Sequence, residues 1–210
     1  MKSKQIIFAL VIGLIAAFIS MNAFSETTPP AAPAAGAEVP GFTQTPALDK
    51  IPNAPIKGVV NGRPFEGKAV YFEPYFGKWK LVIAEKALKE ATDLLDTCQY
   101  FNIDIDEPPA AGKKLAHPWE FGKGYLQVQK TDKPGDNTSW NTENAWVLEI
   151  TKWDVKPYDE KGKMFQQAGT ASGHVYITYG GGTDIKQSWA AGTFTDVPVR
   201  FMGKPEFDFK

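Results

Sequence analysis

The sequence predicts a mainly β protein, an antiparallel β-sandwich or a partly open barrel with one short amphipathic helix. Two observations support this class. Short segments of alternating apolar and polar residues recur along most of the chain. Turn signals rich in Gly, Asn and Pro separate these segments. The alternation argues against a doubly wound parallel sheet, because buried parallel strands are continuous apolar runs.

The first strands are expected around an Asn-Gly turn. Asn61 and Gly62 stand between short apolar runs, and both residue types tolerate the positive φ of a tight hairpin. Two further strands are expected over residues 68–73 and 78–84, where side chains alternate between an apolar and a polar face.

The hydrophobic period changes between Ala84 and Cys98. Leu88, Ala91 and Leu95 recur at helical spacing with charged residues between them, which predicts the single helix. Cys98 falls on the same apolar face. We expect it to be a buried hydrophobic residue, with a partner-linked or reactive thiol as the alternative.

The second half of the chain is expected to return to strands. Residues 102–118 are predicted to be irregular, because three prolines interrupt them. The strands predicted after this segment are 124–131, 145–153, 173–179 and 190–201. Pro198 has no backbone N–H, so the last strand should lie at a sheet edge or carry a bulge there.

Two motifs at the ends of the folded part form a family pattern. The first is residues 58–65, Gly-Val-Val-Asn-Gly-Arg-Pro-Phe, and the second is residues 171–178 followed by Ala191-Gly192-Thr193-Phe194. They resemble small exported bacterial β-sandwich domains, often lipoproteins, which begin with a Gly-x-x-x-Gly-x-x-Phe hairpin and return through Gly-Thr-Phe. Most of that class has no assigned activity, so the resemblance implies a fold and no catalytic residue. This chain lacks the lipidation cysteine.

The first residues of the chain predict export. Lys2 and Lys4 precede an apolar run over residues 6–19, and small residues precede Glu26, as in a secretory signal. An Ala- and Pro-rich tract follows, which predicts a flexible linker. The predicted organisation is a signal peptide at 1–25, a linker at 26–55, a β-sandwich domain at 56–205 and a tail at 206–210. We therefore expect a periplasmic or secreted protein, with an uncleaved membrane anchor as the alternative.

Composition narrows the range of partners. The chain has 23 basic and 24 acidic side chains and a formal charge of -1. This balance offers no extended basic surface for a nucleic acid, so a nucleic acid is not an expected partner. The single cysteine cannot form an intramolecular disulfide.

Nucleophilic and zinc chemistry lack the residues that they need. The two histidines, His117 and His174, are far apart, and no Gly-x-Ser-x-Gly motif exists. A zinc site needs three or four nitrogen or sulfur ligands, which two histidines and one cysteine supply poorly. No cofactor is expected.

An acidic run offers a candidate metal site. Asp104 and Asp106 would point the same way on an extended segment and present oxygens to a hard cation such as calcium. A solvated acidic loop is the alternative.

A second candidate is the polar loop over residues 132–144, which contains Trp140, Asn141 and Asp136. An aromatic ring beside amides and carboxylates suits sugar recognition, although a Trp also tends to bury its large surface. Tyr75 and Trp119 are further aromatic candidates for an exposed contact surface.

Together these features predict an exported, non-catalytic binding domain for an envelope polysaccharide or a periplasmic partner protein. A carbohydrate-active hydrolase that uses Asp or Glu is one alternative. A structural subunit of an envelope assembly is another.

Overall fold

The computed structural model describes residues 41–92, 95, 98–131, 133, 136–157 and 165–202. The predicted signal peptide, the first part of the predicted linker and the predicted tail lie outside these residues. Within them, no helix is long and apolar enough to cross a membrane.

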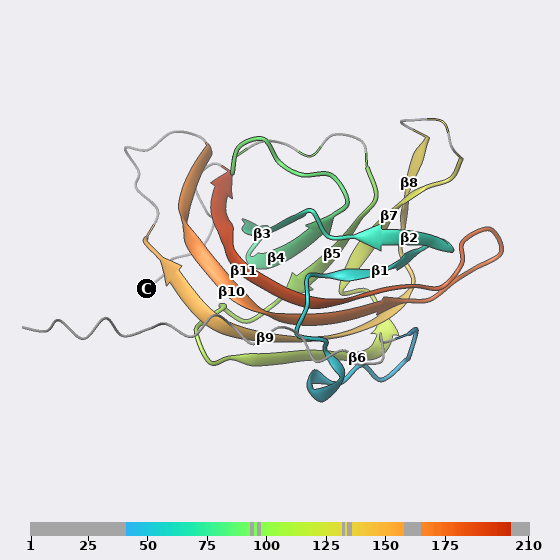
Figure 1. Ribbon diagram of the computed structural model, residues 1–210, viewed down its shortest axis with the longest axis horizontal. Coiled ribbons are helices and arrows are strands. Elements are labelled where there is room, and N and C mark those ends of the chain that lie inside the picture. Colours follow the sequence, from blue (N-terminus) through green and yellow to red (C-terminus); the bar gives the residue numbers. More distant parts are fainter. Residues whose placement is uncertain are drawn as a thin grey trace, which may run out of the picture. The chain divides into compact units, whose positions relative to one another are not determined.

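The described residues form one strongly curled, open β-sheet, a half-barrel (Figure 1). Its strands are β1 (Lys57–Val60), β2 (Arg63–Glu66), β3 (Ala69–Tyr75), β4 (Lys78–Ala84), β5 (Tyr100–Ile105), β6 (Lys114–Phe121), β7 (Gly124–Gln129), β8 (Asn137–Trp140), β9 (Glu143–Val155), β10 (Phe165–Tyr179) and β11 (Ser188–Met202). The hydrogen-bonded order is β6-β9-β10-β11-β3-β4-β5-β7-β8, with β1 paired to β11 and β2 paired to β1. A short 3₁₀ helix, η1 (Leu48–Lys50), precedes the strands.

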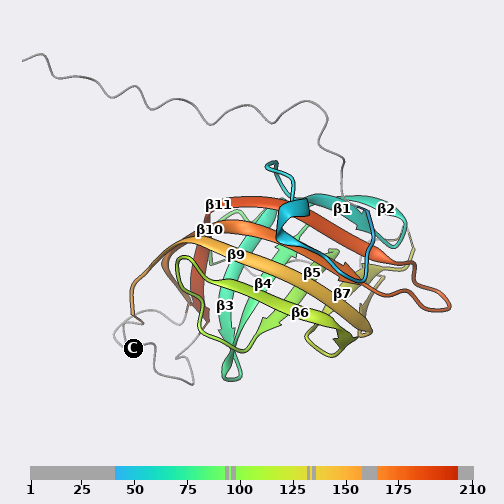
Figure 2. The ribbon, with the colours of Figure 1, turned by 90° about the horizontal axis from the view of Figure 1, so that it is seen from below.

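The mainly β prediction is confirmed, and the arrangement corresponds to an open barrel with a continuous 11-stranded sheet. Ladder pairs are antiparallel except between β11 and β3, which run parallel. In Figure 2, the strands β6, β9, β10 and β11 lie across β3, β4, β5 and β7. The curl therefore brings strands that are distant in the sheet order to face one another.

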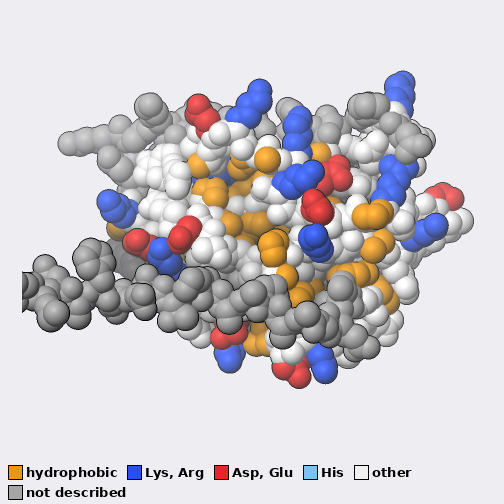
Figure 3. Space-filling view, in the orientation of Figure 1, with side chains coloured by type: hydrophobic (Ala, Val, Ile, Leu, Met, Phe, Trp, Pro, Cys, Tyr) orange, Lys and Arg blue, Asp and Glu red, His pale blue; other side chains and the backbone are white. Residues whose placement is uncertain are grey.

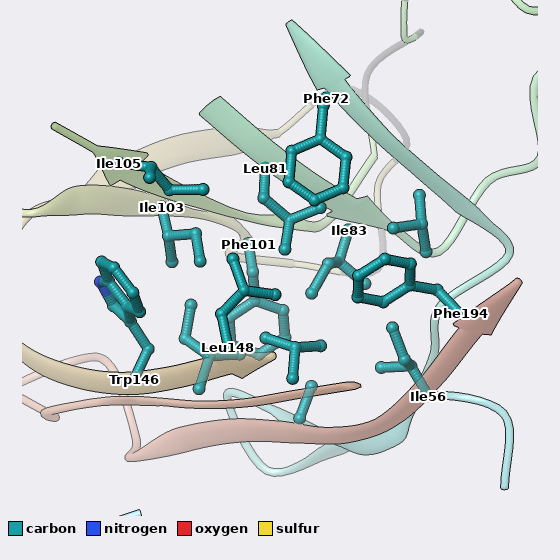
Figure 4. Packing of buried hydrophobic residues seen from close by; sticks show 14 of the residues in the cluster. Ile56, Phe72, Leu81, Ile83, Phe101, Ile103, Ile105, Trp146, Leu148 and Phe194 are labelled. Carbon is teal, nitrogen blue, oxygen red and sulfur yellow. The ribbon is translucent and has the colours of Figure 1, made fainter. Parts of the chain in front are cut away.

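The concave side of the sheet is filled by the inward residues of the alternating strands. Leu81 and Ile83 of β4 and Ile103 of β5 are fully buried, and they face Leu148 of β9 across the core (Figure 4). Trp146 of β9 extends toward β5 at one end of this core. The side-chain alternation expected for the 78–84 and 145–153 strands is thus present.

The predicted helix over residues 84–98 is not observed: the described residues between β4 and β5 form turns and bends. Leu88 and Leu95 still pack, together with buried Cys98, against Ala69 and Ala84 on the outer side of the sheet. These apolar residues therefore make their contacts from turns and bends. Their spacing of three to four residues matches a helix, but the described residues form none.

The segment predicted to be irregular, 102–118, contributes to two strands. β5 pairs with β4 and β7, and β6 pairs with β9 at the edge of the sheet. Pro118 is accommodated by a bulge between His117 and Glu120, where β6 has one residue more than β9. Its missing N–H is tolerated because β6 is an edge strand.

The folded domain begins earlier than the predicted boundary at residue 56. The ring of Phe42 packs edge-on against Trp119 at 5.6 Å between centroids, and the Tyr176 hydroxyl donates a hydrogen bond to the Gly41 carbonyl. The Ala54 carbonyl accepts a hydrogen bond of 2.8 Å from the Thr193 N–H. Residues 41–54, predicted as linker, therefore pack on the sheet.

Replacing Phe101 by Ala should destabilise the domain by about 3–5 kcal/mol, the usual cost of removing a buried aromatic ring. Phe101 is fully buried, and its ring lies 5.1 Å from that of Phe65. Urea unfolding measures the change. The matched control is Phe121→Ala at a residue 67% exposed, which should change stability by less than about 0.5 kcal/mol. Equal effects of the two substitutions would contradict the described core.

Candidate functional site

A polar cavity of about 170 Å³ lies where β5 faces β6 and β9, and we call it the rim pocket. These strands are not hydrogen-bonded neighbours of β5, so side chains alone separate the two walls. The rim pocket is lined by Asp104, Ile105, Asp106, Glu107, Lys114, Leu115, Ala116, His117, Lys123 and Trp146. Acidic and basic side chains are likewise interspersed on the face of the protein seen in Figure 3.

Asp106, which lines the rim pocket, forms two ion pairs. Its carboxylate forms an ion pair with Lys123, which lies between β6 and β7, and a second with Lys78 of β4 at 3.4 Å. The hydrogen bond from Lys123 holds the pKa of Asp106 below its usual value. Asp106 is therefore ionised at neutral pH, with two ammonium groups beside it.

Asp104 has the opposite electrostatic environment. Its carboxyl is half-buried, and burial raises its pKa, although the nearby Lys78 and Lys80 oppose this shift. Lys80 is its direct cross-strand partner on β4. Two carboxyl groups two residues apart thus have pKa values shifted in opposite directions.

His117 and Trp146 form the inner wall of the rim pocket. They are cross-strand partners, 5% and 4% exposed, and their ring centroids are 6.0 Å apart. His117 Nε2 and Trp146 Nε1 are both buried, and neither has a hydrogen-bond partner in the described part of the chain. A buried polar atom without a partner is uncommon in folded proteins, because a protein group or an ordered water usually satisfies it.

Glu120 orients the His117 ring. Glu120 Oε1 lies 3.5 Å from His117 Nδ1, although residues three apart on a regular strand point to opposite faces. The bulge at Pro118 shifts the alternation by one residue and allows this contact. Burial lowers the pKa of His117, so the ring is neutral near pH 7. A proton on Nδ1 facing the carboxylate leaves Nε2 as a hydrogen-bond acceptor.

The two tryptophans predicted as ligand contacts both lie at the glycine-rich segment 180–182. Trp140 donates a 3.1 Å hydrogen bond from Nε1 to the Gly180 carbonyl, and its ring packs so closely on Gly182 that a Cβ there would lie 2.6 Å away. A Cβ at Gly180 would lie 3.4 Å from the Trp119 ring. Both side chains are half-buried, so they support the fold at this turn.

The other predicted contacts lie in different places. Asn141 is exposed beside Trp140, and Asp136 accepts a 2.7 Å hydrogen bond from the Thr131 hydroxyl. Tyr75 is 47% exposed in the β3–β4 hairpin, where the Lys80 ammonium lies 3.1 Å from its ring centroid. Within the described residues, no hydrogen bond or ring contact joins Tyr75 or Asp136 to either tryptophan.

The predicted metal ligands, Asp104 and Asp106, both line the rim pocket. Asp106 is already paired with two lysines. No group of three or more His, Cys, Asp or Glu side chains suited to a metal ion occurs among the residues that the structure describes. The pocket therefore offers paired charges and unpartnered ring nitrogens in place of a ligand shell.

Sequence reasoning did not identify Trp146 or Lys123 as site residues. Trp146 was recognised only as part of an alternating strand, and His117 was considered only as a zinc ligand or catalytic base. The available signal was the His-Pro-x-Glu arrangement of residues 117–120, in which a bulge at the proline brings the histidine and the glutamate together.

No protein family, curated protein or solved structure matches this chain. Its function must therefore be argued from the site itself.

The stability of the protein should decrease as the pH falls from about 7.5 to 5.5, in part because of His117. Burial lowers its pKa in the folded state, so the unfolded chain takes up the proton more readily below about pH 6.5. The free energy of unfolding in urea, measured at both pH values, should fall less in His117→Gln than in the wild type. His174→Gln, at the half-buried His174 of β10, is the comparison variant. Identical pH profiles for all three proteins would contradict the buried, neutral His117.

Proposed function

We propose that this protein is an exported binding domain whose rim pocket holds one sugar unit of an envelope glycan. The observation that carries the proposal is that His117 and Trp146 line one small polar cavity, and that each has a buried ring nitrogen without a partner among the described residues, Nε2 and Nε1 respectively.

The two nitrogens differ in the hydrogen bond that each can form. The indole Nε1 can only donate a hydrogen bond, whereas His117 Nε2 accepts one when Nδ1 carries the proton. A hydroxyl both donates and accepts, so one sugar hydroxyl placed between the two rings would satisfy both atoms. A carboxylate would satisfy the indole alone, and an ammonium would satisfy the imidazole alone. Each buried polar atom left without a partner costs about 1–3 kcal/mol, which favours occupancy by such a group.

The charged residues that line the rim pocket suit the other hydroxyl groups of a sugar. Asp106 and Glu107 can accept hydrogen bonds from hydroxyls, and Lys114 and Lys123 can donate them. The cavity of about 170 Å³ is smaller than the roughly 300–1,000 Å³ pockets that hold drug-sized ligands. It therefore suits one ring or a chain end more than a long stretch of polysaccharide.

An exported domain on a spacer would meet the glycans of the cell envelope, so we take these as the source of the sugar. The basic and apolar start of the chain supports export, and the Ala- and Pro-rich residues after it support a spacer.

One observation favours a hydrolytic alternative for the same pocket. The pKa values of Asp104 and Asp106 are shifted in opposite directions. Enzymes use such a pair of carboxyl groups as a general acid and a general base. Release of reducing sugar from an oligosaccharide, lost in both Asp104→Asn and Asp106→Asn, would establish this alternative.

Trp146→Phe should weaken sugar binding at least tenfold, because it removes the indole donor and keeps an aromatic ring in place. Calorimetric titration of the protein with a panel of neutral and acidic monosaccharides and their tetramers measures the affinity. Trp189→Phe is the matched control: Trp189 is half-buried on β11 and does not line the rim pocket, so this variant should bind as the wild type does.

Glu120→Gln tests the orientation of His117 separately. Without the carboxylate, the imidazole loses the partner that places its proton on Nδ1, so affinity should again fall while the fold is retained. Absence of binding to every sugar in the panel, or equal affinity of wild type and Trp146→Phe, would overturn the proposal.

A further inference from the structure

A second cavity, of about 370 Å³, lies where β3 and β11 separate, and we call it the divergence cleft. One wall is formed by residues 68–70 and the opposite wall by residues 195–198. Residues 88–91 and Gln167 of β10 complete the lining. The divergence cleft shares no lining residue with the rim pocket.

The edge of β11 that faces this cleft is only partly paired. β1 pairs with β11 from Trp189 to Ala191, and the Thr193 N–H is bonded to Ala54. The single ladder pair between β11 and β3 joins Val199 to Phe72. Between Thr193 and Val199, no strand among the described residues is paired to this edge. This stretch of β11 therefore has an edge without a strand partner, although β11 lies in the middle of the sheet order.

A bulge shapes the same stretch. The β10–β11 register moves from Gly173 with Phe194 to Ala171 with Val197, so β11 has one extra residue here. Asp196 takes a φ of 49°, uncommon for a residue other than glycine. Its N–H donates to the Ser172 hydroxyl at 2.9 Å, and its carboxylate pairs with Lys152 at 2.7 Å. Two neighbouring strands thus hold the irregularity in place, and bulges of this kind are frequent beside functional sites.

The lining of the cleft combines apolar and polar groups. Val70, Leu88 and Val197 are its larger apolar residues, and Gln167 and Thr195 are uncharged polar residues. The charged lining residues are Lys68, Lys89, Glu90 and Asp196. Peptides that add a strand to a sheet combine backbone hydrogen bonds along an open edge with pockets for alternate side chains. At this position an edge of β11 without a paired strand lies beside one cavity.

We propose that the divergence cleft binds an extended peptide segment of a partner protein. About five residues of that segment would form a short strand along β11, between β1 and β3, and continue the sheet across its gap. A small apolar side chain of the segment would enter the cleft between Val70 and Val197. This site is independent of the sugar site proposed above.

The probe is the blocked peptide Ac-Thr-Val-Thr-Val-Thr-NH₂, titrated into the isotope-labelled protein and followed by NMR. Saturable shifts are expected for the backbone amides of Val70, Thr195 and Val197, with no change in the Trp146 indole signal. The same peptide with alternate amides N-methylated keeps its side chains and loses half of its backbone donors. It should bind at least tenfold more weakly.

Val197→Glu should also weaken binding of the unmethylated peptide at least tenfold. It places a carboxylate where the apolar side chain of the peptide would enter. Val147→Glu, at a half-buried position on β9 outside the cleft, is the matched control and should leave peptide binding unchanged. Thermal unfolding of both variants verifies that they are folded. Equal binding of the two peptides, or shifts confined to other strand edges, would overturn the proposal. Concentration-dependent shifts at Val197 without peptide would assign the cleft to a second copy of this chain instead.

Discussion

The structure depends on packing between β5 and β9, which face each other without sharing a hydrogen bond. The two halves of the curled sheet share one ladder pair, Val199 with Phe72, so inward side chains must hold the facing strands together. Ile103 and Phe101 from one side and Leu148 and Ile150 from the other are fully buried in this contact. The rim pocket lies at the end of the same contact, where apolar side chains give way to His117 and charged residues.

Both cavities lie where the regular sheet is interrupted. The rim pocket occupies the gap between strands that the curl brings face to face, and the divergence cleft occupies the gap between parallel strands that separate. In each case a bulge beside the cavity changes the direction of side chains, at Pro118 on β6 and at Asp196 on β11. The continuous parts of the sheet supply the core, and the interruptions supply the surfaces suited to ligands.

The sequence was sufficient to predict the strands that alternate clearly, such as β4 and β9, because their inward side chains form the core. It misassigned residues 84–98, because Leu88 and Cys98 pack from an irregular segment while keeping helical spacing. It missed β5, where Ile103 and Ile105 alternate with acidic residues, because the three prolines in residues 102–118 indicated an irregular segment. The partners of His117 could not be predicted, since they depend on strand register and on the bulge at Pro118.

The packing of Phe42 on Trp119 fixes where the chain enters the folded domain. That entry point lies against β6, the same strand that carries His117. Trp119 and His117 are two residues apart on β6, within the stretch that contains the bulge at Pro118. The described chain therefore begins against the strand that also supplies one wall of the rim pocket.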